Sequence, residues 1–246
     1  MDLINIAHIT DLHIVGEGKL NHGIDVRKNF KNILDDILQD DTVHQIIVGG
    51  DLLHEASDTA YYPWIKKQLE KTGIPYRIIP GNHDDSKSLA KSFGLNHELK
   101  DGKLIYFDEL DFGKIIYADT STGDLSIEQL VLIEEECSNS YQKFLLFIHH
   151  PPVEAEVPFM DKNHALVNMD EVQKTLRKIN NIQGIFCGHY HNDRLVRFYN
   201  HIILITPSTF AQISDKSDKL DFGSNLIGWR KIVWDGSYLS TFVKYL

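Results

Sequence analysis

Three consecutive side chains in this sequence can bind a metal ion or move a proton: Asn82, His83 and Asp84. They follow Pro80 and Gly81 at the end of an apolar run. Gly81 permits backbone conformations that other residues resist, so a turn here can present the next side chains outward. Asn82 offers a carbonyl oxygen, His83 a ring nitrogen, and Asp84 an acceptor that could orient the ring. In isolation this composition is also typical of an ordinary polar turn, so its meaning depends on the rest of the chain.

Four further groups of such side chains each follow a stretch that favours a β-strand. They are Asp11-Leu12-His13, Gly50-Asp51, His149-His150-Pro151-Pro152 and Gly188-His189-Tyr190-His191. Asp11 and His13, two residues apart at a strand end, are expected to point the same way. The same geometry is expected of His189 and His191. A histidine pair that follows glycine at a strand end is a better metal candidate than an isolated buried histidine.

The residues between these groups indicate the elements that position them. Strands are expected at residues 3–10, 45–48, 76–79, 144–148 and 182–187. Helices are expected at residues 25–39, 58–71, 126–137 and from 168 to about 179, with N-caps at Asp25, Asp58, Ser126 and Asn168. Alternating strands and helices predict an α/β fold, whose ligand sites lie at the carboxyl ends of the strands. Since all five polar groups fall at such ends, we expect them to form one site.

The rest of the chain adds more strands than one parallel sheet needs. Residues 103–110 and 112–118 read as a hairpin, and the C-terminal third adds strands at 195–199, 202–206, 226–234 and 238–243. We therefore expect two packed sheets with helices outside.

Composition limits the class of protein and its partners. The 246 residues are 42% hydrophobic and 24% charged, without a linker, repeat or low-complexity segment, so one domain over residues 1–246 is expected. The formal net charge of -10 argues against a nucleic-acid duplex as partner. An acidic protein that handles phosphate needs local positive charge, which bound metal cations supply.

The two cysteines, Cys137 and Cys187, lie in apolar contexts and are expected to be buried thiols of a reducing compartment. The N-terminus shows no secretory signal, and no apolar run approaches the roughly 20 residues that span a bilayer. These features predict a cytoplasmic protein without a membrane span.

The strand-end side chains together suit a pair of transition-metal ions. The candidate ligands are Asp11, His13, Asp51, Asn82, His149, His189 and His191, with His83 beside them. Mixed nitrogen and oxygen donors suit Mn, Fe, Co or Zn rather than Ca. Seven donors exceed one four-coordinate ion but match two divalent or trivalent ions about 3.5–4 Å apart that share a carboxylate. Such a pair activates a bridging water and clamps a phosphoryl group.

The five motifs, in this order, resemble the calcineurin-like metallophosphoesterases, and they span most of the chain. Finer matches resemble the bacterial class III cyclic-nucleotide (3′,5′-cAMP) phosphodiesterases: Gly23-Ile24-Asp25, Met160-Asp161, Thr206-Pro207-Ser208-Thr209 with Gln212, and Gly228-Trp229-Arg230. The resemblance implies a four-layer αββα sandwich and hydrolysis of a small phosphodiester or cyclic nucleotide. Members of the family often form dimers, so a homodimer is compatible with the resemblance, although no stretch of the sequence marks an interface.

Roles are carried over from the family by motif position. Asp11, His13 and His191 would hold one metal ion, Asn82, His149 and His189 the other, and Asp51 would bridge them. Substrate contacts would come from His13, Asp51, Asn82, His83 and His191. A metal-bridging hydroxide would attack phosphorus in line, His83 would stabilise the phosphate and protonate the leaving oxygen, and Asp84 would fix the His83 tautomer.

Further residues near the site have open roles. His54 and His164 lie near the expected mouth, His150 would support a metal ligand or form part of the pocket wall, and Asp161 either orients a ligand histidine or caps a turn. The remaining histidines are expected to be packing or surface residues: His8, His22, His44, His97 and His201.

Two alternative functions remain compatible with the sequence. A related enzyme for glycerophosphodiesters or other small diesters would share the metal site and differ in the pocket. A non-catalytic binding scaffold would have lost ligands, whereas every ligand position is filled here.

Overall fold

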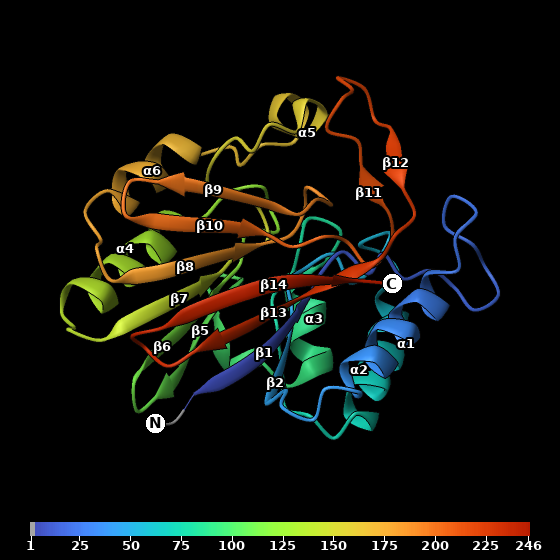
Figure 1. The fold of residues 1–246 in the computed structure, drawn as a ribbon, viewed down its shortest axis with the longest axis horizontal. Coiled ribbons are helices and arrows are strands. Elements are labelled where there is room, and N and C mark those ends of the chain that lie inside the picture. The colour runs from blue at the N-terminus through green and yellow to red at the C-terminus, as the bar shows by residue number, and fades with distance from the viewer. Residues whose placement is uncertain (1–2) are drawn as a thin grey trace.

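Strands of both halves of the chain form two large mixed sheets in the computed structural model, which describes residues 3–246 (Figure 1). The first sheet has the order β14 (Leu239–Tyr245), β13 (Gly228–Trp234), β1 (Ile4–Ile9), β2 (Gln45–Val48) and β3 (Tyr76–Ile78). The strands β1, β2 and β3 run parallel, so their carboxyl ends lie at one edge of the sheet.

The second sheet has the order β4 (Leu99–Lys100), β5 (Lys103–Leu110), β6 (Gly113–Ala118), β7 (Lys143–Phe147), β8 (Ile182–Cys187), β10 (His201–Ile205) and β9 (Arg194–Phe198). The expected hairpin is confirmed, since β5 and β6 pair antiparallel from Leu110 and Gly113 onward. The strands β6, β7, β8 and β10 are parallel, which again gathers their carboxyl ends.

Helices cover the outer face of each sheet. The helices α1 (Val26–Ile37), α2 (Tyr62–Lys71) and α3 (Ser86–Phe93) pack on the first sheet, where Phe30, Leu69 and Val48 belong to one buried apolar cluster. The helices α4 (Ile127–Ser138), α5 (Pro158–Asn163) and α6 (Met169–Leu176) pack on the second. Figure 1 shows α4 and α6 on the opposite side of the molecule from α1 and α2.

A third apolar core joins the inner faces of the two sheets. Ile6 and Trp234 of the first sheet meet Phe147 and Phe186 of the second, all of them fully buried. The four layers, in the order helix, sheet, sheet, helix, are held together by three buried apolar clusters, one between each pair of neighbouring layers. The predicted αββα sandwich is confirmed.

Some elements differ from the sequence-based expectation. Asp25 and Ser126 cap α1 and α4 as predicted, and Ser126 forms a capping box with Gln129. The Asn168 side chain does not cap α6, because it is bound to both backbone groups of Leu125. Residues 59–61 form a 3₁₀ turn, η1 (Thr59–Tyr61), ahead of α2, and the Asp58 side chain does not cap it.

Short elements that periodicity does not predict lie beside the carboxyl ends of the strands. They are α5 and a small sheet of β11 (Gln212–Ile213) and β12 (Phe222–Ser224); a further 3₁₀ turn, η2 (Asn96–Glu98), precedes β4. Each is too short to carry a helix or strand pattern in the sequence.

Candidate metal centre

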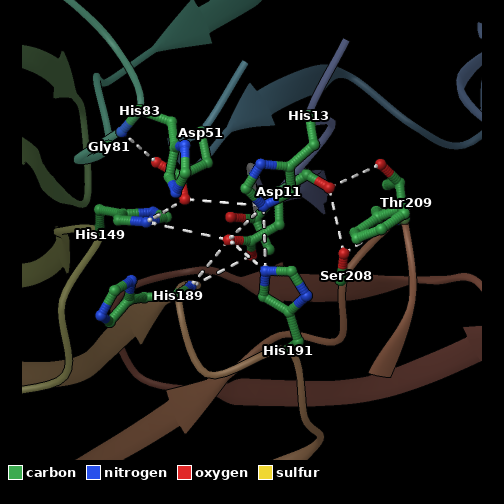
Figure 2. Close-up of polar contacts among 12 residues, drawn as sticks. Asp11, His13, Asp51, Gly81, His83, His149, His189, His191, Ser208 and Thr209 are labelled. Atoms are coloured by element: carbon green, nitrogen blue, oxygen red, sulfur yellow. Dashed lines mark hydrogen bonds and ion pairs between the residues drawn. The ribbon is translucent and has the colours of Figure 1, made fainter. Parts of the chain in front are cut away.

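The five polar groups come together where the carboxyl ends of the parallel strands of both sheets meet. Asp11 and His13 follow β1, Asp51 follows β2, His149 follows β7, and His191 follows β8. Figure 2 shows the imidazoles of His13, His149 and His191 turned toward the carboxylates of Asp11 and Asp51. The expectation that separate strand ends form one site is therefore met by the geometry.

Two groups that contain a carboxylate each have donor atoms within 4.8 Å of one another, and a third group of this kind, without a carboxylate, is His13, His54 and His83. The first group is Asp11, His13 and His191; the second group is Asp51, His149 and His189. In the first, Asp11 Oδ1 lies 3.2 Å from His191 Nε2. In the second, Asp51 Oδ2 lies 3.3 Å from His149 Nε2, and the same oxygen lies 3.7 Å from His13 Nε2 of the first group. Asp51 is thus placed between the two groups.

Backbone carbonyls orient three of the histidine rings. His149 Nδ1 lies 2.7 Å from the Gly49 carbonyl oxygen, and His191 Nδ1 lies 2.8 Å from that of Ala211. His189 Nε2 lies 2.9 Å from the His164 carbonyl oxygen. A carbonyl can only accept, so in each ring that nitrogen donates, and the other nitrogen is the one that can offer a lone pair to a cation.

The backbone at these positions adopts the left-handed conformation that non-glycine residues rarely occupy. Asp11, His13 and Asp51 have φ of 56°, 46° and 52°, and His189 and His191 have 67° and 49°. Each such residue costs about 1–3 kcal/mol, and such strain gathers at functional sites. The strand pattern predicts that His189 and His191 share one direction. Both lie beyond the end of β8, and they belong to different groups.

Two glycines are required by the close approach of these loops. Gly50 has a φ of 105°, and a Cβ there would overlap the His149 ring. A Cβ at Gly188 would overlap the side chains of Thr10 and Asp11. Only glycine lets the loops approach closely enough to bring the ligands together.

The site buries two carboxylates, Asp11 and Asp51, among histidine rings. Although burial opposes ionisation, the neighbouring His191 and His149 lower the pKa of Asp11 to about 2. Burial lowers the pKa of His13 and of His189 to about 3, so both rings are neutral. Burial also disfavours charge on His149, but the carboxylates of Asp51 and Asp11 raise its pKa to about 9.

These residues fit a pair of transition-metal ions. His149 Nε2 is buried with no hydrogen-bond partner among the described residues, and it faces two ionised carboxylates. The Nε2 atoms of His13 and His191 lie 3.1 Å apart, an arrangement typical of two rings that converge on a shared ion. Two cations would take up the lone pairs and balance the buried negative charge.

Asn82 and His83 lie at the rim of this cluster. Asn82 is exposed and lines the same pocket as Asp51 and His189. The His83 backbone N–H donates to Asp51 Oδ1 over 2.9 Å, and its ring lies 4.9 Å from that of His13.

The prediction that Asp84 fixes the His83 tautomer is wrong. His83 Nδ1 lies 2.6 Å from the backbone carbonyl of His54. The buried Asp84 carboxylate instead accepts bonds from the backbone N–H groups of Gly81 and Leu52 and from the Tyr62 hydroxyl. Burial, followed by repulsion from Asp51, raises the pKa of Asp84 to about 7. Asp84 therefore holds the loop that carries His83 rather than the ring itself.

The residues with open roles now have places. His54 and His164 line the pocket. His22, which was expected to be a packing or surface residue, lines it as well. His150 is buried beside His189, with ring centroids 4.1 Å apart. Asp161 caps a turn, since it accepts from the N–H groups of Ala155 and Val157.

Ser208 and Thr209 support the site without being recognised as site residues from the sequence. Both hydroxyls donate to the carbonyl oxygen of Asp11, over 3.1 and 3.3 Å, as Figure 2 shows. They belong to segment 206–212, which resembles the corresponding segment of the family. That resemblance was the signal that could have identified them.

A pocket of about 220 Å³ opens onto the cluster. Besides the polar side chains, its lining includes the apolar side chains of Phe159, Met160, Phe210, Ile213, Leu220 and Phe222. Much of this apolar lining comes from α5 and the small sheet β11–β12.

Two other expectations concern the whole chain. Cys137 and Cys187 are both buried and free in the part of the chain described, as predicted. Among residues 3–246, no helix has the length and apolar character needed to cross a bilayer.

Comparisons with known proteins place the chain in a family. The family model for calcineurin-like phosphoesterases matches residues 4–193. A probable cyclic nucleotide phosphodiesterase of Fibrobacter succinogenes is 35% identical over 243 residues, which cover 99% of this chain and 94% of that protein. A probable glycerophosphodiester phosphodiesterase of Arcobacter nitrofigilis is 27% identical over 83% of this chain and 77% of that one.

A solved structure agrees in fold. The crystal structure of a dimetal phosphatase from Danio rerio superposes with a TM-score of 0.69 and 12% identity, over 98% of each chain. This likeness shows the shared sandwich alone. Together with the family model and the relative at 35% identity, the sequence places this chain in the calcineurin-like phosphoesterase family.

Proposed function

We propose that this protein is a binuclear metal-dependent phosphodiesterase that hydrolyses 3′,5′-cyclic nucleotides, with cyclic AMP as its preferred substrate. The observation that carries the proposal is the mixed lining of the pocket, which combines candidate metal ligands with apolar, partly aromatic side chains. A cyclic nucleotide has matching halves, since its phosphate carries negative charge and its base has a flat apolar face.

The pocket lining contains every residue assigned to substrate binding. His13, Asp51, Asn82, His83 and His191 all line the pocket. Two bound cations, Fe, Mn, Zn or Co, would supply an activated water and neutralise charge on the phosphoryl oxygens. Asp11, His13 and His191 would hold one ion and Asn82, His149 and His189 the other, with Asp51 between them.

His83 is the residue proposed to protonate the leaving group. Its Nδ1 donates to the His54 carbonyl, which leaves Nε2 as the ring nitrogen available to substrate. In the reaction, water forms a new bond to phosphorus, the bond from phosphorus to the 3′ oxygen breaks, and that oxygen gains a proton. The product is the 5′-monophosphate. Asp84 contributes by positioning the loop on which His83 lies.

Turnover of a panel of diesters tests the proposal. Purified protein loaded with Mn²⁺ would be assayed with cyclic AMP, cyclic GMP, 2′,3′-cyclic AMP and glycerophosphocholine, alongside elemental analysis of bound metal. We expect 5′-AMP from cyclic AMP and close to two metal ions per chain. Absence of turnover of any 3′,5′-cyclic nucleotide, with metal bound, would overturn the proposal.

Glycerophosphodiester hydrolysis is the second candidate. It is favoured by the Arcobacter nitrofigilis relative, which is described as a probable glycerophosphodiester phosphodiesterase. The same metal centre would serve, and glycerophosphocholine in the panel decides between the two.

We also propose a cytoplasmic location and one domain over the whole chain. Two buried free thiols suit a reducing compartment. Pairing of β13 with β1 joins the C-terminal strands to the sheet on which the site is built, which supports a single domain. A homodimer is tested by light scattering on the purified chain.

A further inference from the structure

Arg230 is a buried charged residue that neither the metal centre nor the pocket accounts for. It lies on β13, is 3% exposed, and belongs to the sequence match Gly228-Trp229-Arg230. Its side chain is not among the candidate ligands or the pocket lining. Burial of an unpaired guanidinium is strongly unfavourable, so the groups that bond to Arg230 show which parts of the chain it holds in place.

The guanidinium of Arg230 joins two segments that follow strands of the second sheet. Its Nη2 pairs with the carboxylate of Asp193, which lies in the loop after β8, two residues beyond His191. The same nitrogen donates to the carbonyl of Ile205, the last residue of β10, over 2.9 Å, and Nε donates to the Thr206 hydroxyl over 3.3 Å. Because Arg230 belongs to the first sheet, one side chain ties both segments to that sheet.

The segment that begins at the end of β10 holds two members of the first ligand group. The Ser208 and Thr209 hydroxyls donate to the carbonyl oxygen of Asp11. The carbonyl of Ala211 accepts from His191 Nδ1 over 2.8 Å. A shift of this segment would therefore change the positions of both Asp11 and His191, whose donor atoms lie 3.2 Å apart.

The second ligand group has no such tie to Arg230. The rings of His149 and His189 are oriented by the carbonyls of Gly49 and His164. Among the bonds described for residues 3–246, those of the Arg230 side chain go to Asp193, Ile205, Thr206 and Thr241, and none goes to either carbonyl. The contacts of Arg230 thus favour one of the two cations.

We propose that Arg230 is a positioning residue for the first cation: it pairs with Asp193 and bonds the end of β10, and so sets the separation of Asp11 and His191. The inference rests on the proposed binuclear centre and adds a residue that contacts neither metal nor substrate. Groups that hold metal ligands through hydrogen bonds change metal affinity by about 10–100-fold. Arg230 acts one contact further out, so we expect the lower end of that range.

The first test replaces Arg230 by an uncharged side chain of similar length. In Arg230→Met the carboxylate of Asp193, whose side chain is 42% exposed, remains hydrated rather than becoming a buried unpaired charge. Titration calorimetry with Mn²⁺ should show one of two binding events weakened about tenfold. Lys231→Met is the matched control, because Lys231 is the next residue on β13 and bonds to Asp40 and Thr42, outside both ligand groups.

Two single-site backgrounds identify the cation that is affected. His149→Ala disables the second ligand group, and His191→Ala disables the first. Addition of Arg230→Met should weaken Mn²⁺ binding about tenfold in the His149→Ala background and leave it unchanged in the His191→Ala background. A general loss of stability would act on both backgrounds alike. Equal weakening in the two, or weakening in neither, would overturn the inference.

Arg230→Lys keeps the inference testable if Arg230→Met does not fold. The lysine retains a charge beside Asp193, but an ammonium does not reproduce the planar fork that also reaches Ile205 and Thr206. In the His149→Ala background it should weaken Mn²⁺ binding by less than Arg230→Met; an affinity equal to that of the parent would overturn the inference. Failure of the unaltered protein to bind metal would instead overturn the proposed function itself.

Discussion

The first group of candidate ligands is anchored in the interior, whereas the second group is anchored partly at the surface. In the first, His191 donates to the carbonyl of Ala211, which is fully buried. In the second, His189 donates to the carbonyl of His164, an exposed residue at the end of α5. The donor chemistry of the two groups is nearly the same, so the difference lies in how firmly the rings are held.

Two groups with the same kinds of ligands can therefore release their cations at different rates. Exposed loops open locally at lower free energy than buried segments. We therefore expect the cation of the second group to exchange faster with solution than that of the first.

The largest effect is expected from the carboxylate that lies between the groups. Asp51→Asn removes the charge beside both His13 and His149, so both cations should bind more weakly, by more than about 100-fold. Elemental analysis should find fewer than one ion per chain, with activity lost in parallel. Retention of two ions would show that Asp51 does not join the groups.

Replacement of His83 should separate chemistry from metal binding. His83→Ala should keep both cations, because neither of the two groups that contain a carboxylate includes its side chain, while kcat falls by about 100-fold or more through loss of the general acid. His97→Ala, at an exposed histidine away from the pocket, is the control. Loss of one ion in His83→Ala would make His83 a ligand and redefine the groups.

A smaller effect, confined to one group, is expected from a loop glycine. Gly50→Ala places a methyl group against the His149 ring, so the second group should lose its cation while the first keeps one. Gly18→Ala is the matched control, because Gly18 also has a positive φ, of 74°, but open space around it. Metal content near one ion for the first variant and near two for the second would support the comparison; equal contents would contradict it.

The smallest effect is kinetic. Asp161 holds the turn before α5 through the N–H groups of Ala155 and Val157, so Asp161→Ala should loosen the segment that ends at His164. Chelator should remove the two cations in two phases, and only the faster should quicken, by about tenfold. A single phase in the unaltered protein would show that the two anchors are equivalent.

Much of the fold followed from local patterns. Apolar alternation identified the strands that carry the site, and the excess of strands indicated two sheets. The residues at their carboxyl ends then identified a metal site, because parallel strands gather those ends at one edge. The residues that cap helices were less predictable. Asn168, for example, precedes α6 but bonds to the distant Leu125 rather than to its own helix.

The internal geometry of the site was not predictable from spacing. The strand pattern assigns His189 and His191 the same direction, but β8 ends at Cys187, so the alternation of a strand does not extend to them, and they belong to different groups. His83 finds its partner in the His54 carbonyl, and every residue has a carbonyl, so no side-chain pattern marks that contact. His22 reaches the pocket only through tertiary folding of its loop.

The pairing of β1 with a C-terminal strand implies that the site forms fully only after the end of the chain has been synthesised. This first strand pairs with β2 on one side and with β13 on the other, and the Thr10 carbonyl accepts a bond from Thr209. A ribosome-bound chain that has emerged only to His191 would hold every candidate ligand but lack these later supports. Acquisition of metal is thus expected to follow translation. In a cell short of metal, the full-length protein would accumulate without bound ions.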